Sequence, residues 1–377
     1  MAVLTEEQAL LRDMASEWVM DRAPVTALRR TMHDAPATGY DPALYADMAA
    51  MGWAGILVPE AHGGSDFGFV GAGLILEQLG RTLVASPLLS SSLVGVTALR
   101  LGGSLRQQAD WLPRIAAGDA VVVLALEEQA RHDPARTALV AERVGDGWRL
   151  DGVKAPVPDG MAADAFVVVA RVDAAAGGDG IGLFLIDADA PGLSRTMLTR
   201  VDGRGAAQLD FSCVTVRDDA ALGGAGEGGA LLDRILDRGR AGLAAEMLGS
   251  ATQAFDTTID YLRTRVQFGQ LIGSFQALQH RAVGMYGELT LTRSAVEAAL
   301  AALDADSADA PMLVSLAKAL AGETLLGVAR EMVQMHGGIG MTEEHDAGLY
   351  LKRAAVAEAT WGNAAFHRER YGRLAGY

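Results

Sequence analysis

The last third of the chain contains four long stretches in which apolar residues recur at helical spacing. They run from Leu231 to about Arg265, from Ser274 past Leu300, from Pro311 to Gly337, and from about Leu349 to Tyr371. A helix that is apolar along one side has to cover that side, and four such helices joined by short links predict a bundle. We therefore expect a C-terminal helix-bundle domain over residues 226–377.

A different pattern precedes the bundle. Residues 119–225 hold short runs rich in β-branched residues, separated by clusters of Gly, Asp and Pro. This pattern predicts a middle domain that is a small antiparallel β-barrel or sandwich. Residues 1–118 return to helical spacing, and Thr5 with Gln8 forms a capping box before the first helix. The predicted fold class is α+β, mostly α, with the order helical domain, β-domain, helix bundle.

Charge and cysteine content narrow the partners and the compartment. The formal net charge of −15 argues against nucleic acid and anionic membranes as partners. A single cysteine, Cys213, allows no disulfide within the chain, which fits a reducing compartment. We find neither a secretory signal pattern nor an apolar run of the ~18 residues that span a bilayer. We expect a cytoplasmic protein, and the histidine spacings predict no metal site.

Two segments of the bundle suit a dinucleotide. Arg265 ends one predicted helix, Phe268-Gly269 makes a turn, and Gln276 opens the next helix. A guanidinium can pair with a pyrophosphate through two hydrogen bonds, and a helix N-terminus offers free N–H groups to phosphate oxygens. Gln334-Met335-His336-Gly337-Gly338 ends another helix, and its glycines let the backbone approach a ligand. Each feature taken singly has a simpler explanation. Arg265 would complement the dipole at the C-terminus of its helix, and the glycines would end a helix.

Together with Leu236-Asp237-Arg238-Gly239-Arg240, these segments resemble the acyl-CoA dehydrogenases. Phrases near the N-terminus, such as Met51–Glu60 and Glu77–Arg81, resemble the same family, so the resemblance covers essentially the whole chain. It implies FAD as the cofactor. The residues it assigns to the pyrophosphate end of FAD are Arg265, Phe268 and Gln276, and those it places at the FAD of a neighbouring subunit are Gln334, Gly337 and Gly338.

The resemblance also implies a substrate and partners. Asp237 and Arg240 match a segment that contacts the CoA part of an acyl-CoA thioester, although a surface ion pair would explain them equally simply. The family forms tetramers built as dimers of dimers, so we expect either a homotetramer or a heterotetramer with another acyl-CoA dehydrogenase subunit. An electron-transferring flavoprotein is the expected electron acceptor.

The implied reaction requires a carboxylate beside the α-carbon of the thioester. The two positions where the family usually carries this glutamate are Gly239 and Gly362 here. Glu246 lies seven residues after Gly239 on nearly the same helix face, in an apolar stretch where a lone carboxylate is costly to bury. Heteromeric acyl-CoA dehydrogenases of steroid side-chain degradation have a similar glutamate, so Glu246 is the predicted base. An interhelical salt bridge of Glu246, or Glu358 as the base, is the alternative.

The middle domain departs from the family pattern. Leu126-Glu127-Glu128-Gln129 replaces a Thr-Glu-Pro phrase, and Pro158 replaces a Thr or Ser that touches the flavin ring. Proline can donate neither a hydroxyl nor a backbone N–H. The leading hypothesis is an FAD-dependent acyl-CoA dehydrogenase of lipid or steroid metabolism, in which Gly362 widens the pocket for a bulky acyl group. The alternatives are a non-catalytic or half-site subunit of a heteromeric enzyme, and a flavin-dependent oxidase or monooxygenase on the same fold.

Overall fold

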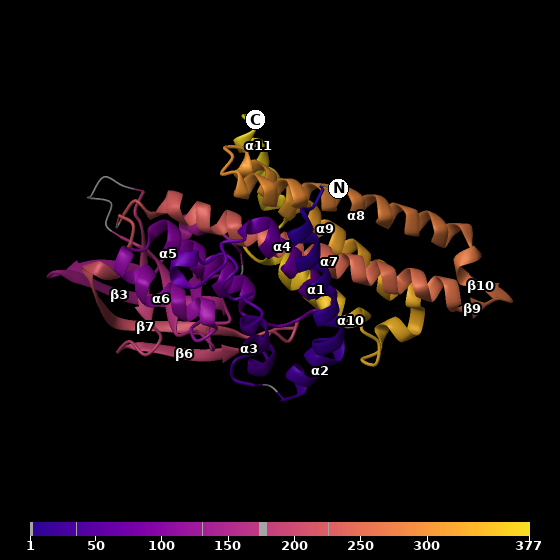
Figure 1. Ribbon diagram of the computed structural model, residues 1–377, viewed down its shortest axis with the longest axis horizontal. Helices are drawn as coiled ribbons and strands as arrows, with labels where there is room; N and C mark the ends of the chain where they lie inside the picture. Colours follow the sequence, from indigo (N-terminus) through magenta and orange to yellow (C-terminus); the bar gives the residue numbers. More distant parts are fainter. Residues whose placement is uncertain (1–2, 35, 130, 173–178, 225) are drawn as a thin grey trace. The chain divides into compact units, whose positions relative to one another are not determined.

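The structure is a computed structural model that describes residues 3–34, 36–129, 131–172, 179–224 and 226–377. The predicted order of helices, β-region and helices is confirmed (Figure 1). Contacts divide the chain into two compact units. Unit 1 comprises the chain up to Leu28, Phe69–Val84 and Arg240–Tyr377, and unit 2 comprises Arg29–Gly68 and Ala85–Gly239. Because these units combine separated stretches, the domain limits at residues 118 and 225 stay predictions.

Unit 1 is organised around α9 (Ala310–His336), a helix that is buried along much of its length. The helices that pack against it are α8 (Gln276–Asp304), α10 (Ala347–Ala359) and α11 (Ala364–Leu374). By length and composition, the stretch Ala310–Met341 could cross a membrane, which corrects the prediction that the chain has no such run. Its most apolar window is 61% buried inside the protein. An apolar composition on all sides is also what a helix in the centre of a bundle requires.

The fourth helix predicted from the sequence is in fact two helices, α10 and α11. Between them lies a turn over residues 360–363, in which Trp361 and Gly362 have φ values of 53° and 106°. No α-helix contains such values. The side chain of Asn363 then accepts the N–H of Phe366 and caps α11. The apolar spacing continues across this turn, which is why the periodicity predicted one helix.

Two further helices complete the part of unit 1 that carries the candidate base. α7 (Gly228–Thr264) contains Glu246, and α4 (Gly68–Arg81) crosses it at glycine contacts. A Cβ added to Gly80 would lie 2.0 Å from the carbonyl oxygen of Glu246, and one added to Gly249 would lie 1.8 Å from that of Glu77. The absence of side chains at these two positions therefore sets how closely α4 and α7 approach. α1 (Glu6–Arg22) begins at the predicted capping box of Thr5 and Gln8.

Unit 2 contains a mixed β-sheet with short helices. Its helices are most of α2 (Val25–Asp34), then α3 (Pro42–Ala50), the π-helix η2 (Leu88–Gly95), α5 (Val96–Gly102) and α6 (Leu105–Ala117). Its strands are β1 (Val122–Ala125), β2 (Val140–Val144), β3 (Gly147–Pro158), β4 (Ala165–Arg171), β5 (Ile181–Asp187), β6 (Leu193–Leu198), β7 (Ala206–Arg217) and β8 (Ala221–Leu222).

The sheet order is β6-β7-β3-β2-β4-β5-β8, with β1 pairing beside β4. Most neighbours are antiparallel as predicted, but β1 and β2 each pair with β4 in parallel. The predicted antiparallel β-domain is thus confirmed for most of the sheet, and the parallel pairs of β4 with β1 and β2 are the exception. Parallel pairing needs a long crossover connection and buried strands, and all four residues of β1 are buried.

The glycine contact between α4 and α7 gives a stability prediction. We expect Gly249→Ala to lower the free energy of unfolding by about 1–3 kcal/mol, because its methyl group would collide with the backbone of α4. The matched control is Gly327→Ala in α9, where no described heavy atom lies within 4 Å of the added Cβ. That variant should gain stability from the higher helix propensity of alanine. Urea unfolding checks both variants, and equal effects would contradict the close contact.

Candidate functional site

Arg265 directly follows α7 and opens a hairpin that Figure 1 shows at the far end of α7 and α8. Strands β9 (Val266–Gln267) and β10 (Gln270–Leu271) pair around a two-residue turn. In that turn Phe268 and Gly269 have φ values of 53° and 77°, the combination that tight hairpins require. The ring of Phe268 is 89% exposed and Arg265 is also exposed. The hairpin therefore presents a cation and an aromatic ring outward.

The other predicted cofactor residues also present open groups. Gln276 is the first residue of α8, and among the described residues no side chain caps that helix. The N–H of Leu278 already donates to the carbonyl oxygen of Phe275, which leaves the N–H groups of Gln276 and Ala277 for an external acceptor. Gln334 is exposed, and within the described part of the chain no heavy atom lies within 4 Å of a Cβ built on Gly337 or Gly338. These six residues all belong to unit 1, and their exposed donors and open backbone fit a pyrophosphate ligand.

The predicted ring side of the cofactor site lies in unit 2, where the loop after β1 is closed by its own bonds. Nζ of Lys154 donates to the carbonyl oxygen of Leu126 at 2.9 Å and to Oε1 of Glu128 at 2.6 Å. The same carboxylate accepts the backbone N–H groups of Ala138 and Leu139. Burial lowers the pKa of Lys154, while the charge of Glu128 opposes that shift. The carbonyl of Leu126 and the carboxylate of Glu128 are thus engaged by neighbouring groups of unit 2.

Pro158 and Glu127, the latter at the start of the loop after β1, are also engaged by neighbouring residues. Pro158 is the last residue of β3 and pairs with Ala206 of β7. Oε1 of Glu127 lies 2.6 Å from Nδ1 of His132, which is almost fully buried. The residues of this region therefore fit the flavin ring less well than those of unit 1 fit the pyrophosphate.

Glu246, the predicted base, is held in an interhelical ion pair. Its Oε1 lies 2.9 Å from both Nε and a terminal nitrogen of Arg353 on α10. Glu246 is 3% exposed and Arg353 is 6% exposed. This arrangement is the salt bridge that the sequence left as an alternative. Glu358, the other candidate, accepts the N–H of Ala364 through its carboxylate. A role of either residue as the base stays a prediction.

The turn between α10 and α11, where the family usually places its base, is held by buried basic side chains. Nε of Arg240 donates to the carbonyl oxygen of Trp361 at 3.0 Å, and Nε2 of His367 donates to the same oxygen at 3.2 Å. Nζ of Lys318 donates to the carbonyl oxygens of Glu358 and Gly362, both at 3.0 Å. These bonds fix the backbone of the turn in its left-handed conformation.

The space beside Gly362 is filled. A Cβ added there would lie 2.5 Å from the ring of Phe366 and 2.9 Å from Nε2 of His367, and the residue itself is buried. The guanidinium of Arg240 lies over the Phe366 ring, with its central carbon 5.4 Å from the ring centroid. In unit 1, the loss of a side chain at Gly362 is thus compensated by neighbouring side chains. It does not leave the wider pocket that the sequence suggested.

Burial also lowers the pKa values of two basic side chains around this turn. Burial lowers the pKa of Lys318 to about 7, with Arg240 and Arg353 adding to the shift and Glu358 opposing it. Burial, followed by the charges of Arg240 and Lys318, lowers the pKa of His367 to about 2. His367 is therefore neutral at pH 7, which matches its role as a single donor to a carbonyl.

The residues predicted to contact CoA are buried on α7. Asp237 is 3% exposed and Arg240 is 1% exposed, and Arg240 is engaged by the turn described above. Their role in binding CoA stays a prediction. No group of three or more His, Cys, Asp or Glu residues suited to a metal occurs among the described residues.

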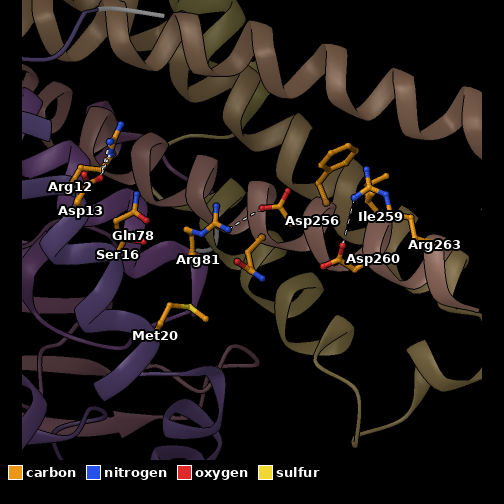
Figure 2. A pocket seen from close by; sticks show the side chains of 12 residues that line it. Arg12, Asp13, Ser16, Met20, Gln78, Arg81, Asp256, Ile259, Asp260 and Arg263 are labelled. Carbon is orange, nitrogen blue, oxygen red and sulfur yellow. Dashed lines mark hydrogen bonds and ion pairs between the residues drawn. The ribbon is translucent and has the colours of Figure 1, made fainter.

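A cavity of about 740 Å³ lies between α1, α4 and α7 of unit 1, as Figure 2 shows. Arg81 reaches Asp256 at 2.9 Å, and Arg263 lies 3.9 Å from Asp260. None of the predicted site residues is among the described residues that line it. Its charges pair with one another, so we assign this cavity no part in the chemistry.

Sequence reasoning missed Lys318, Arg353 and His367. Lys318 carried a usable signal, because it is the one charged residue between Pro311 and Glu323. A lone charge in an apolar helix is costly unless it has partners. Arg353 and His367 have ordinary polar neighbours in sequence, so only their contacts in the bundle reveal them.

The ion pair of Glu246 gives a second stability prediction. Glu246→Gln should lower the free energy of unfolding by about 3–5 kcal/mol, because it leaves the charge of Arg353 buried without its counter-ion. The double variant Glu246→Gln/Arg353→Met removes both charges and should recover most of that loss. Urea unfolding followed by circular dichroism measures both. A single variant as stable as the parent would show that the pair has no structural role.

Lys318 gives a prediction for pH. Its pKa is lowered from 10.5 to about 7, so above pH 7 the folded protein has released a proton that the unfolded chain keeps. The unfolded state then binds more protons, and stability rises with pH in this window by about 1.4 kcal/mol per pH unit. We expect the stability of the parent relative to Lys318→Met to increase at that rate between about pH 7.5 and 9. The control is Lys352→Met at a half-buried position, and a flat difference for Lys318 would contradict the assignment.

Comparisons with known proteins match one family along nearly the whole chain. Family models described as the N-terminal, middle and C-terminal domains of acyl-CoA dehydrogenase match residues 5–119, 124–217 and 226–375. The acyl-CoA dehydrogenase IpdE2 of Mycolicibacterium smegmatis is 31% identical over 353 residues, which cover 93% of each chain.

Two solved structures share the fold. A variant of the steroid ACAD Tcur3481-Tcur3483 is 34% identical, with a TM-score of 0.89 over 98% of both chains. The ChsE4-ChsE5 complex from Mycobacterium tuberculosis is 27% identical, with a TM-score of 0.88 over 100% of this chain and 99% of that one. On these matches, the chain belongs to the acyl-CoA dehydrogenase family of oxidoreductases.

Proposed function

We propose that this chain is one subunit of an FAD-dependent acyl-CoA dehydrogenase that contains a second kind of chain. In this proposal it supplies the pyrophosphate-binding end of the flavin site, and the second chain supplies the catalytic carboxylate and most of the contacts to the flavin ring. The reaction is α,β-dehydrogenation of an acyl-CoA thioester. One observation carries the proposal. Each position that could hold the catalytic base is either a glycine or a glutamate whose carboxylate is bonded to a neighbouring group.

The cofactor half of the proposal rests on the exposed groups of unit 1. Arg265 and Phe268 extend outward on the hairpin, Gln276 begins an uncapped helix, and the backbone at Gly337 and Gly338 is open. These groups would bind and orient the diphosphate of FAD through charge and backbone N–H groups. Because they face away from the bundle, a partner chain can reach the same ligand.

The catalytic half rests on the interior of unit 1. A base must abstract the α-proton of the thioester, so it needs a carboxylate that meets the substrate. Glu246 is bound by Arg353, Glu358 accepts a backbone N–H, and Gly362 is enclosed by Phe366. Flavin, when bound, supplies the acceptor for the β-hydride. The two structural relatives, Tcur3481-Tcur3483 and the ChsE4-ChsE5 complex, are each named for two chains, which supports a composite enzyme.

The substrate and acceptor follow from family membership. We propose an acyl-CoA thioester as substrate, a tetramer assembled from the two kinds of chain, and an electron-transferring flavoprotein as acceptor. Asp237 and Arg240 remain the proposed CoA contacts. With Gly362 enclosed, any preference for a bulky acyl group has to come from the partner's side of the site.

A second candidate is a self-sufficient enzyme in which Glu246 moves off Arg353 and acts as the base. The observation in its favour is that Glu246 is a buried carboxylate on α7, the helix that carries the predicted CoA contacts. In that case Glu246→Gln would abolish turnover and leave the flavin content unchanged. In the composite enzyme, turnover per folded complex persists in that variant. An oxidase or monooxygenase would instead consume oxygen rapidly once reduced and show no dependence on acyl-CoA.

The flavin content of the purified chain tests the proposal. Expressed alone, the chain should carry far less than one FAD per chain and should not oxidise acyl-CoA, because its ring-side residues in unit 2 are engaged with one another. Co-expression with the second acyl-CoA dehydrogenase subunit should yield a flavin-containing complex that reduces an electron acceptor. Absorbance and acceptor-reduction assays measure both quantities.

The control is Arg265→Ala in the co-expressed complex, which should lose flavin. If the chain alone forms a yellow homomer with about one FAD per chain and steady turnover of acyl-CoA, the proposal of a composite enzyme is wrong. The self-sufficient enzyme is then favoured.

A further inference from the structure

Three aromatic rings stack where the two predicted cofactor segments of unit 1 meet. They belong to Tyr261 on α7, His336 at the end of α9 and His345 before α10. The ring centroids of Tyr261 and His336 are 4.3 Å apart with the planes inclined by 31°. Those of His336 and His345 are also 4.3 Å apart, at 47°. His336 is 4% exposed, so its ring is enclosed between the other two.

Two of the three rings, those of Tyr261 and His336, are connected to predicted cofactor residues. The backbone N–H of Arg265 donates to the carbonyl oxygen of Tyr261 at 2.9 Å, so the hairpin begins one helical turn after that ring. His336 is followed immediately by Gly337 and Gly338. The Tyr261–His336 contact therefore joins two segments that are far apart in the sequence.

After His336 the chain forms a short 3-10 helix, Gly337–Met341, most of which is exposed. Gly337 and Gly338 are exposed, as are the side chains of Ile339 (47%) and Met341 (78%). Gly340 is buried, and a Cβ built on it would lie 3.1 Å from Cβ of His336. A loop with few buried contacts opens easily unless a local anchor holds it. The enclosed ring of His336 is such an anchor.

The charge state of the stack favours this contact. Nδ1–H of His336 donates to the carbonyl oxygen of Met332 at 2.7 Å, while Nδ1 of His345 accepts the N–H of Ala347 at 3.1 Å. Burial lowers the pKa of His336; the bond to Met332 opposes this shift and the neighbouring His345 adds to it. A neutral His336 ring can stack on both neighbours without like-charge repulsion.

We infer that His336 is a positioning residue for the cofactor site. Its ring, held between Tyr261 and His345, keeps the Gly337–Gly338 backbone in register with Arg265, so that both segments reach one diphosphate-containing ligand. The inference rests on the proposed function, because it concerns the same FAD-binding groups. It adds a residue that does not itself touch the ligand and that acts through the shape of the loop.

The test compares His336→Ala with His336→Phe in the flavin-binding complex. The Kd for FAD is measured by titrating the apoprotein, and hydrogen exchange is followed in the loop over residues 337–341. His336→Ala should raise the Kd about tenfold, the effect of losing one or two ring contacts, and should speed exchange in that loop. His336→Phe keeps the ring and should stay within about twofold of the parent. The exposed exchange His33→Ala is the matched control.

Two further substitutions, Arg265→Ala and Tyr261→Leu, distinguish a failure of the proposed function from a failure of the positioning role. If Arg265→Ala leaves the Kd unchanged, the proposed function fails. If Arg265→Ala weakens FAD binding but His336→Ala does not, only the positioning role fails. If His336→Phe is as weak as His336→Ala, the bond to Met332 and not the ring stack is responsible, and the inference is overturned. In the double variant Tyr261→Leu/His336→Ala, the two effects should be less than additive, because both residues act through one contact.

Discussion

Buried cations shape the end of the bundle where α10 meets α11. Moving such a charge out of water costs several kcal/mol unless polar partners replace the water. Arg240 donates to the carbonyl of Trp361, as does the neutral His367, and Arg353 pairs with Glu246. Lys318 donates to the carbonyl of Glu358 near the end of α10 and to that of Gly362 in the turn. These partners impose the left-handed turn that separates the two helices and bring Phe366 over Gly362.

The same constraint divides the charged residues of unit 1 into two groups. The charged residues near the usual base positions have structural roles, because each one holds a neighbouring helix or turn in place. Arg265, which opens the hairpin, is exposed and available to a ligand. A chain with this division can contribute strongly to binding a cofactor and weakly to abstracting a proton. That asymmetry supports the proposed composite active site.

Local pattern predicted the larger elements well. The apolar spacing identified α7, α8 and α9, and the capping box identified the start of α1. It missed the break at residues 360–363, because the spacing continues across the turn. It also missed the parallel pairing of β1 with β4, since pairing direction depends on how the connection after β1 folds. For the candidate site, the sequence named both the exposed residues of the hairpin and the buried Glu246, but the partner of Glu246 lies on another helix and carries no local signal.

The sequence alone determined the order of the parts and the family, and it named the residues that we propose bind a diphosphate, because these depend on periodicity and on short motifs. It also determined that glycine replaces glutamate at the two usual positions. Only the tertiary structure decided what those replacements mean. Whether a buried carboxylate is free or paired, and whether the space beside a glycine is open or filled, depends on side chains from distant helices. Burial makes those contacts decisive, because an unpaired charge or an empty cavity in the interior is too costly to keep.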